Sequence, residues 1–425
     1  MAATLRAPRS LPLDGAPVAR ICAALDDPDW LRSLREAWWD RYGRTPFPSG
    51  KEEEWRRADL TEAPFGAELL LDPPPPALGL LGVPDGTPLA PQLAEAGVVF
   101  TDLRTAVREH PELVRTYLGS GESLPSHAKF WALAQAAWTG GVFLHVPAGV
   151  DVDGPLLART SIDLRGAAHF PQTIVVAGPN SRVTLVEEFT SGDGGEPGWT
   201  AGAVDLRAAE GARVRYVNLQ RLATSAWNLG FQRAEVGPSA DLATLNVEVG
   251  SRLTKLGTQV RMTGDGGTSR LLGVLAAGDD QVIDVNSYQD LAASHTTSEL
   301  LYLSALYERA RASFYGIIRV RPGTRQTSSY QECRNLLLSP HAGAEPIPVL
   351  EIESNDILRC GHGATAGALD PTQLFYAQTR GLDPDTAAKM IVRGFFEQVL
   401  GKLDEASVKE LMLAALAPRI GRELA

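Results

Sequence analysis

The sequence predicts a mainly β protein, in which a strand-rich core lies between helical N-terminal and C-terminal regions. Between about residues 140 and 359, β-branched residues alternate with polar ones in short runs that glycine, asparagine and aspartate interrupt, as expected for half-buried strands. No amphipathic helix of about 12 residues separates these runs, so βαβ units are not expected there. Before and after this region, apolar residues recur at intervals of three and four, which is typical of helices.

The N-terminal region is expected to contain short helices with irregular connections. Apolar spacing predicts helices at Pro17–Leu25, at residues 30–42 and at residues 101–118. Asp102 can cap the last of these helices, and Pro111 is expected to divide it into two, because proline removes a backbone donor and clashes with the preceding turn.

A weak repeat runs through the strand-rich region. A turn signal, a small or polar residue and then an apolar run recur five times, and the first apolar residues are Val183, Val214, Leu242, Leu271 and Phe314. The intervals between them are 31, 28, 29 and 43 residues. Near-regular spacing in this range favours a solenoid or β-helix, in which each coil stacks on the next. An ordinary β-sandwich, with strands spaced at about 8–12 residues, is the alternative.

The C-terminal region has clear helix signals from Asp370 onward. Asp370-Pro371 and Asp383-Pro384 each place a capping residue before a first-turn proline. The second helix carries a wide apolar stripe that comprises Ala387, Ala388, Ile391, Val392, Phe395, Phe396, Val399 and Leu400. A tail of this length cannot form a large core alone, so the stripe is expected to contact either the β region or another protein.

Composition and charge exclude several classes of protein. The chain has 40 basic and 51 acidic residues, a net charge of −11 and no basic stripe, which argues against nucleic-acid binding. Its three cysteines, Cys22, Cys333 and Cys360, lie far apart and do not suggest a disulfide scaffold. No segment has the roughly 20 apolar residues of a membrane span, and no signal peptide is visible. A cytoplasmic protein without a membrane partner is therefore expected.

The sequence also lacks the common signatures of catalysis. It contains no phosphate-binding loop of an ATPase, no HExxH motif and no GxSxG motif. Residues 361–366 fit a dinucleotide-binding pattern, but only helices are expected after them, where such a site needs a second strand. Acidic pairs such as Glu187-Glu188 would point to opposite faces of a strand, which argues against a carbohydrate-active enzyme. We therefore expect a protein that is not an enzyme.

The best candidate for chemistry is the sequence Cys360-Gly361-His362. If an expected strand at residues 349–359 continues through it, Cys360 and His362 point to the same face, because residues two apart do so in a strand. A thiolate and an imidazole together suit iron, an iron–sulfur cluster or zinc. The alternative is that Cys360 is a small buried hydrophobe and His362 a turn residue bonded to the backbone.

Few further metal ligands lie near in sequence. Only Cys333 and His341 also fall late in the β region, whereas an iron–sulfur cluster usually takes four ligands. Such a set does not make a closed, permanent site, but a partner chain could complete it. Transfer or assembly of a metal or cluster is therefore favoured over storage or redox catalysis.

Several motifs resemble those of the SufB/SufD family of iron–sulfur cluster assembly proteins. They are residues 281–284 (QVID), 295–298 (HTTS), 314–320 (FYGIIRV), 348–352 (PVLEI), 360–365 (CGHGAT), 374–376 (LFY) and 379–381 (TRG), with 52–56 (EEEWR), 129–133 (KFWAL) and 146–149 (VPAG) upstream. The match extends over most of the chain. The Cys-x-His-Gly-Ala-Thr form resembles SufD more than SufB, in which glutamate takes the place of Gly363.

The resemblance implies a right-handed parallel β-helix core at residues 136–362, between a mostly helical N-terminal domain at residues 1–135 and a helical, ATPase-binding C-terminal domain at residues 363–425. It further implies a SufD-like subunit of the SufBCD scaffold complex, which assembles iron–sulfur clusters and is coupled to ATP hydrolysis by SufC. The partners would be a SufB-like paralogue and a SufC-like ABC ATPase. A purely structural partner that stabilises SufB, or a homodimeric scaffold, is the alternative.

The resemblance also implies roles for particular residues. His362, at the SufB–SufD interface, and the neighbouring Cys360 would be ligands of a nascent cluster shared with the partner chain. The group held there would be a transient iron–sulfur cluster or iron, and no cofactor would be permanently bound. The C-terminal residues expected to contact a partner are Phe375, Tyr376, Arg380, Ile391, Phe395 and Phe396.

Overall fold

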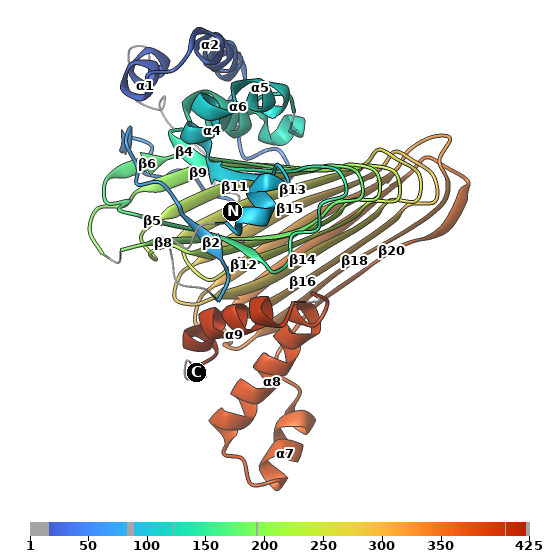
Figure 1. The fold of residues 1–425 in the computed structure, drawn as a ribbon. Coiled ribbons are helices and arrows are strands. Elements are labelled where there is room, and N and C mark those ends of the chain that lie inside the picture. The colour runs from blue at the N-terminus through green and yellow to red at the C-terminus, as the bar shows by residue number, and fades with distance from the viewer. Residues whose placement is uncertain (1–16, 83–88, 122, 193, 404, 422–425) are drawn as a thin grey trace.

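The chain forms a flattened parallel β-solenoid with helices on both of its outer faces (Figure 1). This architecture is seen in a computed structural model that describes residues 17–82, 89–121, 123–192, 194–403 and 405–421. Along the core, the chain passes back and forth between two sheets, and each strand pairs in parallel with the strand one coil earlier. The prediction of a parallel β-helix is therefore confirmed, and the alternative of a β-sandwich is wrong.

The two sheets, named sheet A and sheet B, face each other across the interior. Sheet A contains, in spatial order, β19 (Gly343–Ile352), β17 (Arg311–Val320), β15 (Val282–Leu291), β13 (Leu253–Met262), β11 (Trp227–Val236), β9 (Trp199–Ala208), β7 (Pro171–Ala177), β4 (Gly140–Val146) and β3 (Val99–Asp102). Sheet B contains β2 (Ala77–Leu80), β5 (Leu156–Ile162), β8 (Arg182–Ser191), β10 (Arg213–Arg221), β12 (Asp241–Glu248), β14 (Thr268–Ala277), β16 (Thr297–Leu306), β18 (Arg325–Leu337) and β20 (Asp356–Gly367). The short strands β1 (Glu68–Leu69) and β6 (Ala167–His169) extend sheet A beside β9. The core thus continues a little beyond the expected boundary at residue 362.

The register between strands shows which part of the predicted repeat is correct. Val183, Val214 and Leu242 are direct neighbours in sheet B, as the intervals of 31 and 28 residues predict. The last two positions of the predicted repeat are wrong. The neighbour of Leu242 is Ser269, two residues before the predicted leucine, and Phe314 belongs to sheet A.

Polar residues in the interior explain this error. The column that begins with Val183 continues through Ser269, Ser298 and Ser329 to Cys360. The hydroxyl of Ser269 donates to Ser298 Oγ at 2.7 Å, which lets the pair lie buried. Because hydroxyl groups replace apolar side chains in this column, a pattern of hydrophobic residues alone loses the register.

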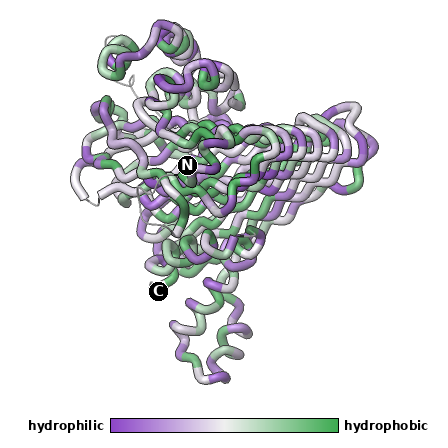
Figure 2. Tube along the Cα trace, in the orientation of Figure 1, coloured by the Kyte–Doolittle hydropathy of each residue, from purple (hydrophilic) through white to green (hydrophobic). Residues whose placement is uncertain are grey.

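Most strands of the central coils are buried on both faces, whereas the sequence predicted half-buried strands. In β10, Val214 and Tyr216 point into the interior between the sheets, while Val217 and Leu219 point outward. The outward pair belongs to one buried cluster with residues of the C-terminal helices. Figure 2 shows hydrophobic residues along the strands of the solenoid and on the helices against it.

Most of the N-terminal helices cover the outer face of sheet A, whereas α3 packs through Leu93 against the interior cluster (Figure 1). They are α1 (Pro17–Leu25), α2 (Asp29–Arg44), α3 (Pro91–Glu95), α4 (Leu103–Glu109), α5 (Pro111–Tyr117), the 3-10 helix η1 (Pro125–His127) and α6 (Ala128–Ala137). Asp102 caps α4 by accepting a hydrogen bond from the backbone N–H of Thr105, and Pro111 begins α5, as predicted. The sequence did not predict β2 and β3, which add antiparallel to β5 and β4; each has only four residues, too few for a clear pattern.

One buried cation joins the N-terminal region to sheet A. Lys255 in β13 donates to Asp284 Oδ2 in β15 at 2.6 Å, and both side chains are almost completely buried. Its Nζ also donates to the backbone carbonyl of Glu54 and lies 4.8 Å from the centroid of the Trp55 ring. Burial lowers the pKa of Lys255, and the Asp284 carboxylate opposes this shift. Two sequence motifs that are far apart along the chain therefore meet at one ammonium group.

The C-terminal helices are α7 (Pro371–Thr379), α8 (Pro384–Leu400) and α9 (Ala406–Ile420). Asp370 and Asp383 cap α7 and α8 as predicted. Residues of α8 and α9 are buried in one cluster with the outer face of sheet B, so the apolar stripe of α8 contacts the β region. α7 and the beginning of α8 project away from the solenoid (Figure 1). None of the described helices is both long enough and apolar enough to cross a membrane.

Candidate metal centre at the open end of the solenoid

The two sheets end at β19 and β20, and these strands form the open end of the solenoid. Within the described residues, β19 pairs only with β17 and β20 only with β18, so the outer edge of each strand has no partner strand. Two large apolar side chains lie exposed on them, Ile352 at 43% and Leu358 at 71%. Unpaired backbone groups on such edges can hydrogen-bond to a strand of another chain.

The chain crosses from one sheet to the other at this end. It leaves β19 at Ile352 and enters β20 at Asp356, so the expected single strand at residues 349–359 is wrong. Ser354 fixes the turn between them, because its hydroxyl donates to the backbone carbonyl of Thr324 at 2.6 Å.

Cys360 and His362 lie on the interior face of β20, which confirms that they share a face. In the register of β20 against β18 they lie beside Ser329 and Gln331, two buried residues of the interior. Residues two apart along a strand are separated by about 6.6 Å. Cys360 is partly buried against the interior apolar cluster, whereas His362 is exposed. The imidazole is thus accessible from the open end, and it belongs to a strand rather than to a turn.

This chain does not complete a metal site with these two residues. Among the described residues, no group of three or more His, Cys, Asp or Glu side chains is placed to hold a metal ion. Cys333 lies inside β18, where burial raises the pKa of its thiol to about 12 and Asn335 Nδ2 lies 3.6 Å from its Sγ. His341 lies in the turn between β18 and β19. Cys333 and His341, the two further metal ligands that the sequence suggested, therefore do not lie in one site with Cys360 and His362.

The glycines that flank His362 lie against Tyr330 on the outer face of sheet B. A Cβ atom at Gly361 would lie 3.4 Å from two ring carbons of Tyr330, and one at Gly363 would lie 2.9 Å from its hydroxyl oxygen. Arg359 stacks on the same ring, with its Cζ 4.1 Å from the centroid. The ring therefore packs against backbone that carries no side chains on this face. This packing gives a physical reason for the Gly-His-Gly order. Sequence reasoning missed Tyr330, because only the register of β20 against β18 places it beside Gly361.

The interior face of β18 next to Cys360 and His362 is polar and incompletely hydrogen-bonded. Thr327 Oγ1, Ser329 Oγ and Gln331 Oε1 are buried and have no partner among the described residues. Sequence reasoning missed this row as well, because only the register shows that it lies beside the candidate ligands. Buried polar atoms are nearly always hydrogen-bonded, so these three atoms are exceptions, as are several in the central coils, such as Thr244 Oγ1 and Gln289 Oε1.

The predicted partner-binding residues of the C-terminal region differ in exposure. Phe375 and Tyr376 of α7 are 67% and 62% exposed, and Arg380 donates to the Tyr376 hydroxyl at 3.0 Å. Ile391 and Phe395 of α8 are partly buried. Phe396 is completely buried against sheet B, so it anchors α8 to its own chain and is not part of an exposed surface.

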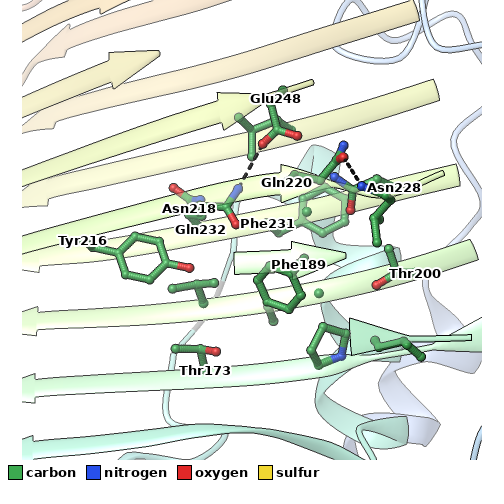
Figure 3. Close-up of a pocket in the computed structure, with 18 of the residues that line it drawn as sticks. Thr173, Phe189, Thr200, Tyr216, Asn218, Gln220, Asn228, Phe231, Gln232 and Glu248 are labelled. Carbon is green, nitrogen blue, oxygen red and sulfur yellow. Dashed lines mark hydrogen bonds between the residues drawn. The ribbon is translucent and has the colours of Figure 1, made fainter. Parts of the chain in front are cut away.

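A separate cavity of about 50 Å³ lies inside the solenoid (Figure 3). Its lining is mainly apolar and contains neither a thiol nor an imidazole. Glu248 is fully buried at this cavity; its Oε1 accepts a hydrogen bond from Asn218 Nδ2 at 3.0 Å, and its Oε2 has no hydrogen-bond partner in the described part of the chain. Burial raises the pKa of Glu248 to about 8. The volume corresponds to about three to five water molecules, which is too small for a cofactor.

These features define a class of protein. It is a parallel β-solenoid whose open end presents a thiol, an imidazole and two strand edges that no described strand pairs with. Two soft or borderline donors are too few for a closed metal site. The geometry therefore suits a metal or cluster site that a second chain completes.

Comparison with known proteins identifies the family. The family described as SUF system FeS cluster assembly, SufBD core domain, matches residues 160–395. An iron–sulfur cluster assembly SufBD family protein of Staphylococcus epidermidis is 30% identical over 306 residues, which cover 72% of this chain and 65% of that protein. Proteins of the same description from Staphylococcus haemolyticus and Staphylococcus aureus are each 29% identical over the same shares. The match thus spans about 65% of the length of these relatives. The chain belongs to the SufB/SufD family.

Proposed function

We propose that this chain is a SufD-like subunit of a cytoplasmic scaffold complex that assembles iron–sulfur clusters with a SufB-like paralogue and a SufC-like ABC ATPase. The observation that carries this proposal is the position of Cys360 and His362 on β20, the last strand of an open-ended solenoid. The chain itself does no covalent chemistry. It supplies two donors and a docking edge, and the nascent cluster is the cargo of the complex.

The open end is the proposed contact with the SufB-like paralogue. Strands of the partner would continue both sheets by hydrogen-bonding to the free edges of β19 and β20. The exposed side chains of Ile352 and Leu358 would then become buried. The partner would add thiolate ligands beside His362 and Cys360, since a cluster iron prefers a thiolate-rich tetrahedral set.

The C-terminal helices are the proposed contact with the ATPase. The exposed residues of α7, Phe375 and Tyr376, offer apolar and aromatic area next to the cationic Arg380. The C-terminal half of α8 is anchored on sheet B through Phe396 and its neighbours. A movement of the ATPase subunits that displaces α7 would therefore be transmitted through α8 to the sheet that carries Cys360 and His362.

The SufD-like assignment rests on the residue after the histidine. In the SufB pattern, a glutamate follows the histidine, at the position that Gly363 takes in this chain. A Cβ atom at that position would lie only 2.9 Å from the Tyr330 hydroxyl, so the packing around β20 favours glycine. This supports a SufD-like chain.

The alternative is a subunit that stabilises its partner, or a second copy of itself, without binding the cluster. This structural role is favoured by the small number of donors, because among the described residues no third metal ligand lies near Cys360 and His362. In that case the open end would serve only as a docking edge.

A co-purification experiment separates these functions. The tagged full chain is isolated from its native cells without oxygen, the bound proteins are identified by mass spectrometry, and iron, sulfide and the visible spectrum are measured. We expect an ABC ATPase and a cysteine-richer paralogue, and we expect His362→Ala to abolish cluster assembly while the complex persists. His341→Ala, which changes a histidine in a turn outside the site, is the matched control. Normal cluster assembly with His362→Ala would show that His362 is not a required ligand, and normal assembly with Cys360→Ala as well would establish the purely structural role.

A further inference from the structure

Gln331 spans the interior of the solenoid beside the candidate ligands. It lies on β18 in sheet B, and its Nε2 donates to the backbone carbonyl of Gly316 on β17 in sheet A at 3.1 Å. A Cβ atom at position 316 would lie 2.5 Å from Gln331 Oε1. The absence of a side chain at Gly316 therefore leaves room for the amide, and the hydrogen bond fixes its orientation.

The carbonyl oxygen of this anchored amide is not satisfied. Gln331 Oε1 is buried and has no hydrogen-bond donor among the described residues, and the residue as a whole is 1% exposed. A buried acceptor that lacks a hydrogen bond is energetically unfavourable. Because Nε2 is already committed to Gly316, the amide cannot turn around to hide this oxygen.

His362 is the residue beside Gln331 at the open end. The two residues are direct register partners on β20 and β18, and both point to the interior face. Neighbouring strands lie about 4.8 Å apart, and the two side chains have similar reach. For a hydrogen bond, a ring nitrogen of His362 would have to lie within about 3 Å of Gln331 Oε1. A neutral imidazole has one N–H donor and one acceptor nitrogen.

We infer that Gln331 is a positioning residue, whose carbonyl oxygen accepts a hydrogen bond from the imidazole N–H of His362 and thereby directs the other ring nitrogen toward the open end. Histidines that bind metals usually donate their second nitrogen to such an acceptor, which sets the tautomer and the ring orientation. The inference rests on the proposed function, because it assigns an orientation to the proposed ligand. The proposed hydrogen bond also gives a role to the buried carbonyl oxygen of Gln331.

The tautomer of His362 can be measured directly. The full chain is labelled with ring-¹⁵N histidine, and the ring nitrogen shifts are recorded at pH 8.5, with His362→Gln used for assignment. In the unsubstituted chain we expect one dominant tautomer. Gln331→Met removes the acceptor at similar length and should give a mixed population, whereas Gln331→Glu keeps an acceptor oxygen and should preserve the single tautomer. The signals of His341 in the same spectra are the internal control.

Unchanged tautomer populations in Gln331→Met, with the fold intact, would overturn the inference. Ser287 Oγ, on the strand next to Gly316, is also buried and has no hydrogen-bond partner within the described ranges; it would then be the better donor to Gln331. Gly316→Ala is the second variant, because its Cβ atom displaces the carbonyl oxygen of Gln331 without a change of residue 331; the same atom would also press on the Phe314 ring. It should mix the tautomers as Gln331→Met does.

Iron binding by the intact complex distinguishes this inference from the proposed function. Loss of such an outer hydrogen bond typically weakens metal binding about 10–100-fold, and this range is expected for Gln331→Met. If His362→Ala leaves iron binding unchanged, the proposed ligand is wrong, whatever the tautomer. If His362→Ala abolishes iron binding but Gln331→Met changes neither the tautomer nor the affinity, only the positioning role is wrong.

Discussion

The hydroxyl of Tyr330 occupies the space that a side chain at Gly363 would need. A Cβ atom at Gly363 would lie 2.9 Å from this oxygen, while one at Gly367, in the same strand, would meet nothing within 4 Å. The tyrosine ring thus covers the backbone that carries His362 on the opposite face. The glycines of β20 beside His362 therefore leave the space that Tyr330, one coil earlier, occupies.

Substitution of Gly363 tests this match. Gly363→Ala should be less stable than Gly367→Ala by about 1 kcal/mol, because overpacking must displace the tyrosine. Both variants share the gain in intrinsic strand propensity, so their difference isolates the contact. Thermal unfolding measures it, and the added substitution Tyr330→Ala should remove the difference between the two. Equal stability of the two alanine variants would contradict the steric role of Tyr330.

Substitution of two phenylalanines of the C-terminal region should distinguish a role in stability from a role in binding the ATPase. Phe396 is 0% exposed and Phe375 is 67% exposed. Phe396→Ala should cost about 3–5 kcal/mol, because it leaves a cavity between α8 and sheet B. Phe375→Ala should change stability by less than about 0.5 kcal/mol but reduce capture of the ATPase. Thermal unfolding and co-purification, carried out on both variants, test this division; full ATPase capture by Phe375→Ala would remove α7 from the proposed contact.

Glu248 should make stability depend on pH. Burial raises its pKa from 4.5 to about 8, so at intermediate pH the folded state binds a proton that the unfolded state has lost. The contribution of this proton to the free energy of unfolding is complete below pH 4.5. It is lost as the pH rises toward 8, at up to about 1.4 kcal/mol per pH unit. Glu248→Gln should therefore flatten the decline in unfolding temperature between pH 5 and pH 8. Glu299→Gln, an exposed glutamate on β16, is the control and should follow the unsubstituted chain.

The buried residues Lys255 and Asp284 should be energetically coupled, so that removal of one charge destabilises the fold more than removal of both. The two atoms Lys255 Nζ and Asp284 Oδ2 lie 2.6 Å apart, with side chains 0% and 2% exposed. Lys255→Met should cost about 3–5 kcal/mol, since it leaves a buried carboxylate without its cation. The double variant Lys255→Met/Asp284→Asn should recover part of this loss. Unfolding temperatures of the three variants test the coupling, and purely additive losses would contradict it.

Cys360 should be the cysteine that alkylating reagents reach. Burial raises the pKa of Cys22 to about 11 and that of Cys333 to about 12, so at pH 8 roughly one thousandth or less of either thiol is the reactive thiolate. Cys360 is only partly buried. Mass spectrometry after brief treatment with iodoacetamide should find Cys360 modified first in the isolated chain and protected in the complex. Cys360→Ser is the control, and equally rapid modification of Cys333 would show that the open end unfolds locally.

The helix ends and the general architecture could be predicted because their signals are local. Pro17 to Leu25, the Asp102 cap and the caps at Asp370 and Asp383 depend on residues within a few positions of each other. The coil interval was correct for Val183, Val214 and Leu242 because each of these positions is apolar. It failed where serine enters the same interior column.

The candidate site could be predicted only in part. The shared face of Cys360 and His362 follows from their spacing in any strand. The position of that strand at an open end, with Gln331 and Ser329 beside it, depends on pairing with residues 31 positions earlier. The role expected of Phe396 as a contact residue could not be judged from the sequence, because an apolar stripe is the same whether it covers its own chain or a partner.

The sequence by itself determined the classes of segment, the approximate coil length, the thiol and imidazole of the candidate site and, through its motifs, the SufB/SufD family. The tertiary structure alone decided which coil is last, which strand edges stay unpaired and which polar atoms remain buried beside the site. The reason is physical: local propensities and spacing act over a few residues, whereas burial and register depend on contacts between coils about 30 residues apart.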